Sequence, residues 1–351
     1  MILACGIPTE APMRLVIEAA ARLGVELILF NQRLSAQIEL EYTATTRGAA
    51  TQGRTQQGGL DRADTQVRLL RIEGVLHLPD GDYPLEAFSG VYLRLMDYQD
   101  LPEFVNNAKP PADKEPPLRF NGQGLNPEPV NLLTASQQRI YTAHESLVNW
   151  LEVAPLRVMN RLSAMGSNQS KPYQAQLIAQ AGFSIPPTLI TNDPEAVRTF
   201  QQTYPRVIYK SISAVRSVVR ELGRSAFNEL EKIRYLPTQF QAYIPGENIR
   251  VHVAGERVFA TRIRSDAIDY RYAGQAGLDF GLEEVYIEEE VTERCLRLSR
   301  LLELPLCGID LKRTPSGELY CFEANPSPAF SFYQEPTGQD IAAAVVSYLS
   351  Q

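Results

Sequence analysis

Three oxygen-bearing side chains near the C-terminus could bind one metal ion together. Asp310 lies in the apolar run 304–311, and Glu323 and Asn325 lie two positions apart in a second run after the turn 314–317. Side chains at positions i and i+2 of a strand point to the same face, so a hairpin of the two runs would place all three on one patch. Hard oxygen ligands, without a thiol or an imidazole, suit Mg²⁺. The pattern predicts a magnesium site of the kind that ATP chemistry uses.

The composition indicates a globular protein with more than one core. The chain has 351 residues, which predicts two or three units of ordinary domain size. Hydrophobic residues make up 44% and charged residues 21%, and no apolar run approaches the roughly 20 residues of a membrane-spanning helix. The first residues lack the basic region of a signal peptide. We therefore expect a cytoplasmic protein with no membrane partner.

The cysteines and the net charge exclude several classes of site. The four cysteines are scattered without C-x-x-C spacing, so we expect buried thiols and neither a zinc site nor a disulfide framework. The net charge of -7 argues against general affinity for nucleic acid, which requires clustered Lys and Arg. Nothing in the sequence separates a subunit interface from a core, so a homo-oligomer is compatible with it.

The first thirty residues predict a β-α-β unit. Apolar runs at residues 2–5 and 25–30 flank a helical stretch with Pro12 in its first turn and Gly24 at its end. The turn after the first run has one glycine, so the G-x-G-x-x-G motif of dinucleotide-binding folds is absent. The first half is therefore expected to be an α/β domain of the doubly wound type without a nicotinamide site.

Two segments interrupt regular structure in this half. Residues 44–66 are rich in Gly, Thr and Gln and poor in large apolar side chains, which predicts a mobile loop. Residues 106–130 carry six prolines and predict an irregular excursion. Residues 140–151 have the apolar spacing of a helix. We expect this helix to close an N-terminal domain over residues 1–158.

The second half predicts an α+β fold in two parts. Ser170, before a Lys-Pro pair, is placed to begin a helix, and several short strand-like runs follow. Helices near residues 291–303 and 339–349 flank the C-terminal hairpin. We expect one part over residues 159–238 and a second, with the metal site, over residues 239–351.

Several short motifs and single residues follow one another in order through this half. They are Lys171 at a helix start, the stretch 182–192, Lys210 at a strand end, Gln241-Ala242-Tyr243-Ile244, Asn248-Ile249-Arg250, and Asp310 with Glu323 and Asn325. Their order resembles the ATP-grasp superfamily and, within it, the RimK-like carboxylate–amine ligases. The resemblance includes the graspetide (microviridin-type) ligases that crosslink peptides. The resemblance rests on the order of these motifs, since none of them is decisive by itself.

The resemblance implies an ATP-grasp fold of two subdomains behind a Rossmann-like pre-ATP-grasp domain. It implies an enzyme that moves the γ-phosphate of ATP to a carboxylate, after which an amine attacks the acylphosphate and ADP is released. Such catalysis needs in-line positioning and neutralisation of charge. The implied cofactors are ATP and Mg²⁺, with Mn²⁺ as the alternative ion. The implied partners are a small-molecule or peptide carboxylate and an amine.

The resemblance also implies roles for single residues. Lys171 and Lys210 would contact the nucleotide phosphates, and Arg250 would face the transferred phosphoryl group, which suits a planar guanidinium. Glu247 is a candidate ribose contact, with a solvated turn glutamate as the alternative. Adenine would bind to backbone groups of a hinge formed by Gln241, Ala242, Tyr243 and Ile244. Relatives often carry Glu where this chain has Ala242, so a side-chain contact there is absent.

Four further residues are candidates for substrate binding, each with a structural alternative. His252 shares a strand face with the expected catalytic arginine, so it is either a base or substrate contact, or a structural hydrogen-bonding residue. Arg264 and Arg271 are similar to acceptor-side or phosphate-side positions of the peptide-modifying relatives, with surface salt bridges as the alternative. Arg94 lies at an expected strand end in the first half, where it would hold a carboxylate.

Four functions remain open from the sequence. The segment 211–220 after the second lysine has no glycine, whereas relatives often close a glycine-containing loop over the phosphates. This departure leaves the substrate less defined than the nucleotide. The leading hypothesis is an ADP-forming carboxylate–amine ligase, and the nearest rival is a graspetide synthetase that forms lactones or lactams within a precursor peptide. A non-catalytic nucleotide-binding module and an adenylating ligase are the others.

Overall fold

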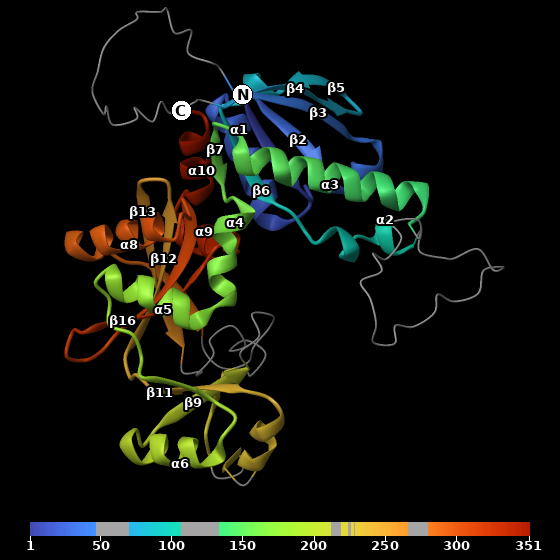
Figure 1. The fold of residues 1–351 in the computed structure, drawn as a ribbon. Helices are drawn as coiled ribbons and strands as arrows, with labels where there is room; N and C mark the ends of the chain where they lie inside the picture. The colour runs from blue at the N-terminus through green and yellow to red at the C-terminus, as the bar shows by residue number, and fades with distance from the viewer. Residues whose placement is uncertain (47–69, 107–132, 212–218, 224–225, 228, 266–279) are drawn as a thin grey trace, which may run out of the picture. The chain divides into compact units, whose positions relative to one another are not determined.

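The computed structural model describes residues 1–46, 70–106, 133–211, 219–223, 226–227, 229–265 and 280–351 (Figure 1). The described chain forms two compact units, one of Met1–Pro8 with Leu27–Arg157 and one of Thr9–Glu26 with Val158–Gln351. Most of the expected loop 44–66 and nearly all of the proline-rich segment 106–130 lie outside the described residues. Within the ranges above, no helix has the length and apolar character needed to cross a bilayer.

The first unit contains a parallel sheet and an antiparallel sheet. β1 pairs in parallel with both β2 and β6, and all five residues of β1 are buried. Its continuous apolar run is typical of a parallel strand that is covered on both faces. The strands of the parallel sheet are β1 (Ile2–Gly6), β2 (Leu27–Asn31) and β6 (Gly90–Arg94), and β7 (Arg157–Met159) follows at the junction of the units. The antiparallel sheet consists of β3 (Glu39–Thr46), β4 (Leu70–Leu78) and β5 (Gly81–Pro84).

Two helices follow from short capping signals. Helix α1 (Ala11–Leu23) has a proline in its first turn and ends at Gly24, whose φ of 67° is left-handed. This helix connects the parallel strands β1 and β2, so the predicted β-α-β connection is confirmed. Helix α3 (Ala135–Val153) begins at a capping box of Thr134 and Gln137 and buries Trp150.

The second unit contains a four-stranded antiparallel sheet among its described residues. The sheet has the order β10-β9-β11-β8, and helix α6 (Pro194–Thr203) contacts β8. Asp193 caps this helix, as its position before Pro194 predicts. The strands are β8 (Thr188–Thr191), β9 (Val207–Ser211), β10 (Arg220–Glu221) and β11 (Thr238–Ala242).

A larger antiparallel sheet follows, in the order β14-β13-β12-β15-β16. Its core face packs against α5 (Lys171–Gln180) and α8 (Glu289–Leu301). Alternation along β12 sends Ile249, Val251 and Val253 into this core, so the intervening residues face the other way. The strands are β12 (Glu247–Ala254), β13 (Arg257–Ser265), β14 (Phe280–Glu284), β15 (Leu306–Arg313) and β16 (Leu319–Asn325).

Helix α9 (Ser331–Thr337) was not expected from the sequence, because it is short and carries a proline in its last turn. The helix expected near residues 339–349 is α10 (Ile341–Leu349), which packs against α1 within the second unit. The remaining helical pieces are η1 (Gln32–Gln37), η2 (Leu85–Ala87), η3 (Tyr98–Asp100), α2 (Pro102–Val105), α4 (Leu162–Met165), η5 (Gly166–Gln169) and η6 (Leu230–Tyr235).

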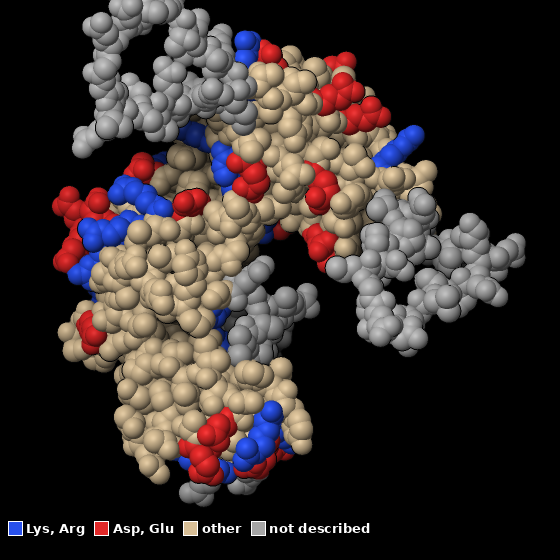
Figure 2. All heavy atoms as spheres, viewed as in Figure 1, with Lys and Arg blue, Asp and Glu red and all other residues tan. Residues whose placement is uncertain are grey.

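Acidic and basic side chains intermingle over helix α8 (Figure 2). Arg294 pairs with Glu290 one turn earlier, and Arg300 pairs with Glu256 at 3.0 Å. These pairs are largely exposed to solvent. This part of the surface therefore carries no extended field of one sign.

Candidate active site

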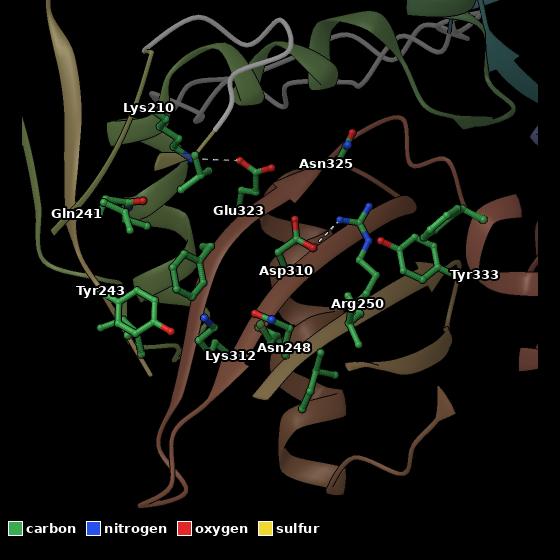
Figure 3. A pocket seen from close by; sticks show the side chains of 18 of the residues that line it. Lys210, Gln241, Tyr243, Asn248, Arg250, Asp310, Lys312, Glu323, Asn325 and Tyr333 are labelled. Atoms are coloured by element: carbon green, nitrogen blue, oxygen red, sulfur yellow. Dashed lines mark hydrogen bonds and ion pairs between the residues drawn. The ribbon is translucent and has the colours of Figure 1, made fainter. Parts of the chain in front are cut away.

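Three charged side chains form a row across neighbouring strands of the larger sheet (Figure 3). Arg250 of β12 lies opposite Asp310 of β15, and Asp310 lies opposite Glu323 of β16. Residues directly opposite each other in antiparallel strands project to the same face. Asn325, two residues after Glu323, lies opposite Gly308 and projects to this face as well. The predicted hairpin is present, and it brings the three predicted oxygen donors together.

A β-bulge on β16 adds an aromatic side chain to this row. Asp310 pairs with Glu323 and Leu311 pairs with Cys321, so Phe322 is the extra residue on its strand. Phe322 and Glu323 both line the same cavity, although they are consecutive in sequence. Strict alternation would send one of them into the core, and for this reason the sequence interpretation missed Phe322.

Glu323 accepts contacts from two lysines that belong to different elements. Lys171 Nζ at the start of α5 lies 3.0 Å from Glu323 Oε2, and Lys210 Nζ near the end of β9 lies 3.7 Å from the same atom. Burial alone would raise the pKa of Glu323, but the charges of Lys210 and Lys171 outweigh it and lower the pKa from 4.5 to about 2. The carboxylate is therefore ionised at neutral pH.

A buried glutamine fixes the helix that carries Lys171. Gln174 Nε2 donates to the Ala324 carbonyl at 2.9 Å, and the Ala324 N–H donates to Gln174 Oε1 at 3.1 Å. β16 is at the edge of its sheet, so these backbone groups would otherwise lack a partner. Gln174 and Lys171 are three residues apart and share one side of α5. The sequence interpretation missed Gln174, and the polar residue one turn after Lys171 is the signal that could have found it.

The Arg250 guanidinium is held in place from several directions. Its NH1 donates to Asp310 Oδ1 at 2.7 Å, and the Tyr333 ring centroid lies 5.6 Å from its central carbon. Arg250 is only 5% exposed. A Cβ on Gly308 would lie 2.0 Å from NH2, so the absence of a side chain at this position gives the guanidinium its space. The arginine is therefore fixed at the floor of the cavity.

His252 lies behind Arg250 and is fully buried. Its Nε2 accepts a hydrogen bond from Arg250 Nε at 3.4 Å, and its ring packs edge-on against Tyr333 with centroids 4.8 Å apart. Burial, together with the charge of Arg250, holds the pKa of His252 well below its usual value. These contacts agree with the structural alternative for His252, a neutral histidine that accepts a hydrogen bond, and not with a substrate contact.

The predicted hinge borders the same cavity. Gln241, Tyr243 and Ile244 line it, and the side chain of Gln241 donates to Thr188 Oγ1 at 3.0 Å. The backbone N–H groups of Ala242 and Tyr243 already donate to carbonyls 2.9 Å away. No hydrogen bond joins the N–H of Ile244 to another described residue, so this donor is available to a ligand.

Asn248, and not Glu247, lines the cavity. Glu247 instead pairs with Arg262 of β13 at 2.5 Å. Alternation along β12 explains the difference, because Asn248 lies two residues before Arg250 and shares its face. The same alternation could have identified Asn248 from the sequence.

Of the other predicted substrate residues, Arg264 does not line the cavity. Arg264 is exposed and pairs with Glu283 of β14. Arg94 is the last residue of β6 in the first unit. Arg271 lies outside the described residues, as does most of the glycine-free segment 211–220.

The cavity has a volume of about 470 Å³, which suits a small molecule. One end contains the charged groups, the hinge borders the other end, and Tyr333 of α9 lies beside Arg250 (Figure 3). Phe332 of the same helix also lines the cavity and packs edge-on against Tyr333. All of these residues belong to the second unit. The cavity therefore combines a charged end with an apolar end that offers a backbone donor.

The donor set at the charged end fits a hard divalent ion. Asp310 and Glu323 provide carboxylates, and Asn325 provides an amide oxygen that also accepts from the Ser327 N–H at 3.0 Å. In the described part of the chain, no group of three or more His, Cys, Asp or Glu side chains converges as a metal site. Two carboxylates and one amide oxygen suit Mg²⁺ or Mn²⁺ and not a soft metal. All four cysteines are buried and free.

Comparisons with known proteins agree with this chemistry. A family model described as a RimK-like ATP-grasp domain matches residues 168–349. A protein from Alkalilimnicola ehrlichii named as a probable alpha-L-glutamate ligase is 27% identical over 203 residues, which cover 55% of this chain and 67% of that protein.

Two solved structures resemble the whole chain. One is a RiPP-associated ATP-grasp ligase from Chryseobacterium gregarium in complex with ADP and a leader and core peptide, with a TM-score of 0.70, 20% identity and coverage of 99% and 96% of the two chains. The other is the macrocyclase MdnC from Microcystis aeruginosa MRC bound with precursor peptide MdnA, with a TM-score of 0.69, 19% identity and coverage of 99% of each chain. At these identities the likeness establishes an ATP-grasp fold.

The family model spans more than half of the chain, and every residue named above as lining the cavity lies within its match. The charged row, the two lysines and the hinge therefore occur together in a segment of known family. This chain belongs to the RimK-like ATP-grasp family.

Proposed function

We propose that this ATP-grasp carboxylate–amine ligase activates a peptide carboxylate as an acylphosphate, releases ADP and joins the acyl group to an amine. One observation carries the proposal. Lys171, Lys210 and Arg250 converge on two carboxylates at one end of a cavity whose other end is the hinge. That arrangement matches a nucleotide with its phosphates at the charged end and its base at the hinge.

The hinge end supplies a site for adenine. Ile208 and Phe322 provide apolar surface on the walls, and the Ile244 N–H provides a directional donor for the edge of the base. We propose that residues 159–238 and 239–351 act as the two subdomains that enclose the nucleotide. Residues 1–158 then form the pre-ATP-grasp domain, with the Rossmann-like character that the sequence predicts.

The charged end supplies cations for phosphoryl transfer. Lys171 and Lys210 donate to phosphate oxygens, and they exchange their present contacts with Glu323 for contacts with the nucleotide. Mg²⁺, when bound by Asp310, Glu323 and Asn325, neutralises phosphate charge. Arg250 has donors fixed by Asp310 and His252, so it can face the moving phosphoryl group without reorganisation.

The proposed reaction has two steps. A carboxylate oxygen of the substrate attacks the γ-phosphorus of ATP, the bond from that phosphorus to the bridging oxygen breaks, and ADP leaves. An amine nitrogen then attacks the acyl carbon, inorganic phosphate leaves, and the amine loses a proton. The chain's own contribution is to align the groups and to stabilise negative charge.

A second candidate is a synthetase that crosslinks side chains within one precursor peptide. The supporting observation is that two solved structures whose fold matches 99% of this chain contain a precursor peptide or a leader and core peptide. In that case a hydroxyl or an amine of the same peptide attacks the acylphosphate, which gives a lactone or a lactam. Each crosslink removes one water from the peptide.

Product analysis tests both candidates. The protein is incubated with Mg²⁺, ATP and either a pool of amino acids and peptides or any short acidic peptide found encoded beside it. We expect ADP and phosphate, with a peptide mass that rises by an added residue for the first candidate and falls by one water per crosslink for the second. AMP and pyrophosphate would instead indicate an adenylating ligase. An Asp310→Ala, Glu323→Ala double variant that turns over ATP at the parent rate would contradict the assigned site.

A further inference from the structure

The side-chain amide of Asn160 is buried between two backbone segments of the second unit. Asn160 is 2% exposed and directly follows β7 in the sequence. Its Nδ2 donates to the carbonyls of Leu306 and Pro326, each 2.6 Å away, and the Leu306 N–H donates to its Oδ1 at 3.0 Å. One short side chain therefore connects the first residue of β15 to the residue that follows β16.

This amide takes the place of a residue in the ladder between β15 and β16. The last pair of the ladder is Gly308 with Asn325, and residues two steps farther on would have the same orientation. A continued ladder would therefore pair Leu306 with Ser327. The Ser327 N–H instead donates to Asn325 Oδ1 at 3.0 Å. Asn160 offers Leu306 one donor and one acceptor, as a strand residue would, so β15 stays bonded where β16 has left it.

The end of this ladder matters because Asn325 is a predicted metal donor. It is the last residue of β16 and shares the cavity face with Asp310 and Glu323 (Figure 3). Because Asn160 occupies the backbone groups of β15, the Ser327 N–H is available to orient the Asn325 amide. The orientation of one metal donor thus depends on a side chain that lies outside the cavity lining.

General stabilisation of the fold is the competing role for a buried amide. Gln32 of the first unit has that role, because it is 2% exposed and bonds to both backbone groups of Met96, at 2.6 Å and 2.9 Å. Asn160 makes the same pair of bonds with Leu306 and adds a third, to the carbonyl of Pro326. The third bond falls on the residue next to the metal donor, so it distinguishes the two amides.

We propose that Asn160 is a positioning residue for the metal ion, because it ends the ladder at Asn325 and keeps the amide oxygen of Asn325 beside the two metal-binding carboxylates. The inference rests on the metal site of the proposed function. Without Asn160 the end of β16 is no longer fixed, and Asn325 contributes less to metal binding. Loss of a residue that orients a metal donor predicts about a tenfold loss of metal affinity.

Calorimetric binding of Mn²⁺ to the ADP complex of the full chain tests this inference. Asn160→Leu is compared with Gln32→Leu, the matched control that loses the same pair of buried bonds in the first unit. We expect Asn160→Leu to raise the Kd for Mn²⁺ about tenfold and to leave the Kd for metal-free ADP nearly unchanged. The control should lower the unfolding temperature but keep the parent Kd for Mn²⁺.

A double-variant cycle keeps the test decisive if Asn160→Leu does not fold. Asn160→Ala leaves space for a water molecule to bond the same backbone groups, so it should fold and weaken Mn²⁺ binding to a smaller extent. In an Asn325→Ala background, Asn160→Ala should have no effect on Mn²⁺ binding, since Asn160 acts through Asn325.

Three outcomes would overturn the inference. They are an unchanged Kd for Mn²⁺ in Asn160→Leu, an equal rise of that Kd in Gln32→Leu, and an effect of Asn160→Ala that is the same with and without Asn325. A parent that binds ADP but no Mn²⁺ would contradict the metal site of the proposed function itself, and the inference with it.

Discussion

The two ends of the cavity are built in different ways. At the charged end, the side chains of Lys171, Lys210 and Arg250 all contact carboxylates. Further hydrogen bonds fix the helix that carries Lys171. At the hinge end, aromatic and apolar side chains surround a backbone donor, and Lys312 Nζ lies 5.2 Å from the centroid of the Tyr243 ring. The charged end is preorganised as an ion network, so the removal of one member leaves several charges uncompensated. A single substitution at the hinge end should therefore lower the activity less than a single substitution at the charged end.

The largest effect is expected when Glu323 is removed. Glu323→Ala eliminates one predicted metal donor and leaves two lysines, both less than 15% exposed, without this anion. We expect ATP turnover to fall by a factor on the order of 1,000, because neutralisation of charge is the main catalytic term in phosphoryl transfer. ADP release is the measurement. Glu318→Ala, on the turn before β16, is the control, and equal losses in both variants would refute the comparison.

The same carboxylate should make folding stability depend on pH. Because the folded pKa of Glu323 is lowered from 4.5 to about 2, its stabilising effect is present above pH 4.5 and is lost as the pH falls towards 2. Denaturant unfolding of the parent and of Glu323→Gln should therefore differ by on the order of 2 kcal/mol at neutral pH, with a gap that narrows through this window. A gap that stays constant down to pH 2 would argue against the ion network.

Gln174 offers a test of indirect positioning. Gln174→Leu removes two hydrogen bonds to the edge strand and loosens the helix start that carries Lys171. We expect the KM for ATP to rise about tenfold, since two buried backbone groups lose their partner and the lysine moves with the helix. Gln176→Leu is the matched control, because Gln176 is exposed on the same helix. Equal KM values for the two variants would remove Gln174 from the site.

The smallest effect is expected at His252, which supports Arg250 without reaching the cavity. Loss of one neutral acceptor predicts that His252→Leu lowers kcat severalfold and leaves the KM for ATP nearly unchanged. His252→Gln can place an oxygen near the position of Nε2, so it should restore most of the rate. A Gln variant as slow as the Leu variant would show that packing against Tyr333 matters more than the hydrogen bond.

Local patterns in the sequence predicted much of the second unit. The turn between the apolar runs 304–311 and 319–325 and the i, i+2 spacing of Glu323 and Asn325 indicated a hairpin with its oxygen donors on one face, and β15 and β16 form that hairpin. Lys171 and Lys210 were assigned through the family resemblance, since a lysine at a helix start is by itself an ordinary surface residue. The sequence offers no local rule that places both beside Glu323.

Features that depend on long-range contacts escaped the sequence interpretation. Helix α9 carries Tyr333 under Arg250, but a seven-residue helix with an internal proline has no periodic signal. Gln174 acquires its role from the edge of a sheet, at a backbone group 150 residues away in sequence. Glu247 was named as a candidate from its place shortly after Pro245-Gly246, whereas alternation along the strand places its neighbour Asn248 in the cavity.

The bulge at Phe322 makes the hairpin unusually tolerant of a change in length. A deletion within a strand normally rotates every later side chain to the opposite face. Here Asp310 and Leu311 are consecutive on β15, and they pair with Glu323 and Cys321, which flank Phe322 on β16. Deletion of Phe322 would make these two partners consecutive as well, so the register of the other pairs would not change. Related chains could thus gain or lose this ring in the cavity by a single-codon insertion or deletion, while the oxygen donors beyond it keep their places.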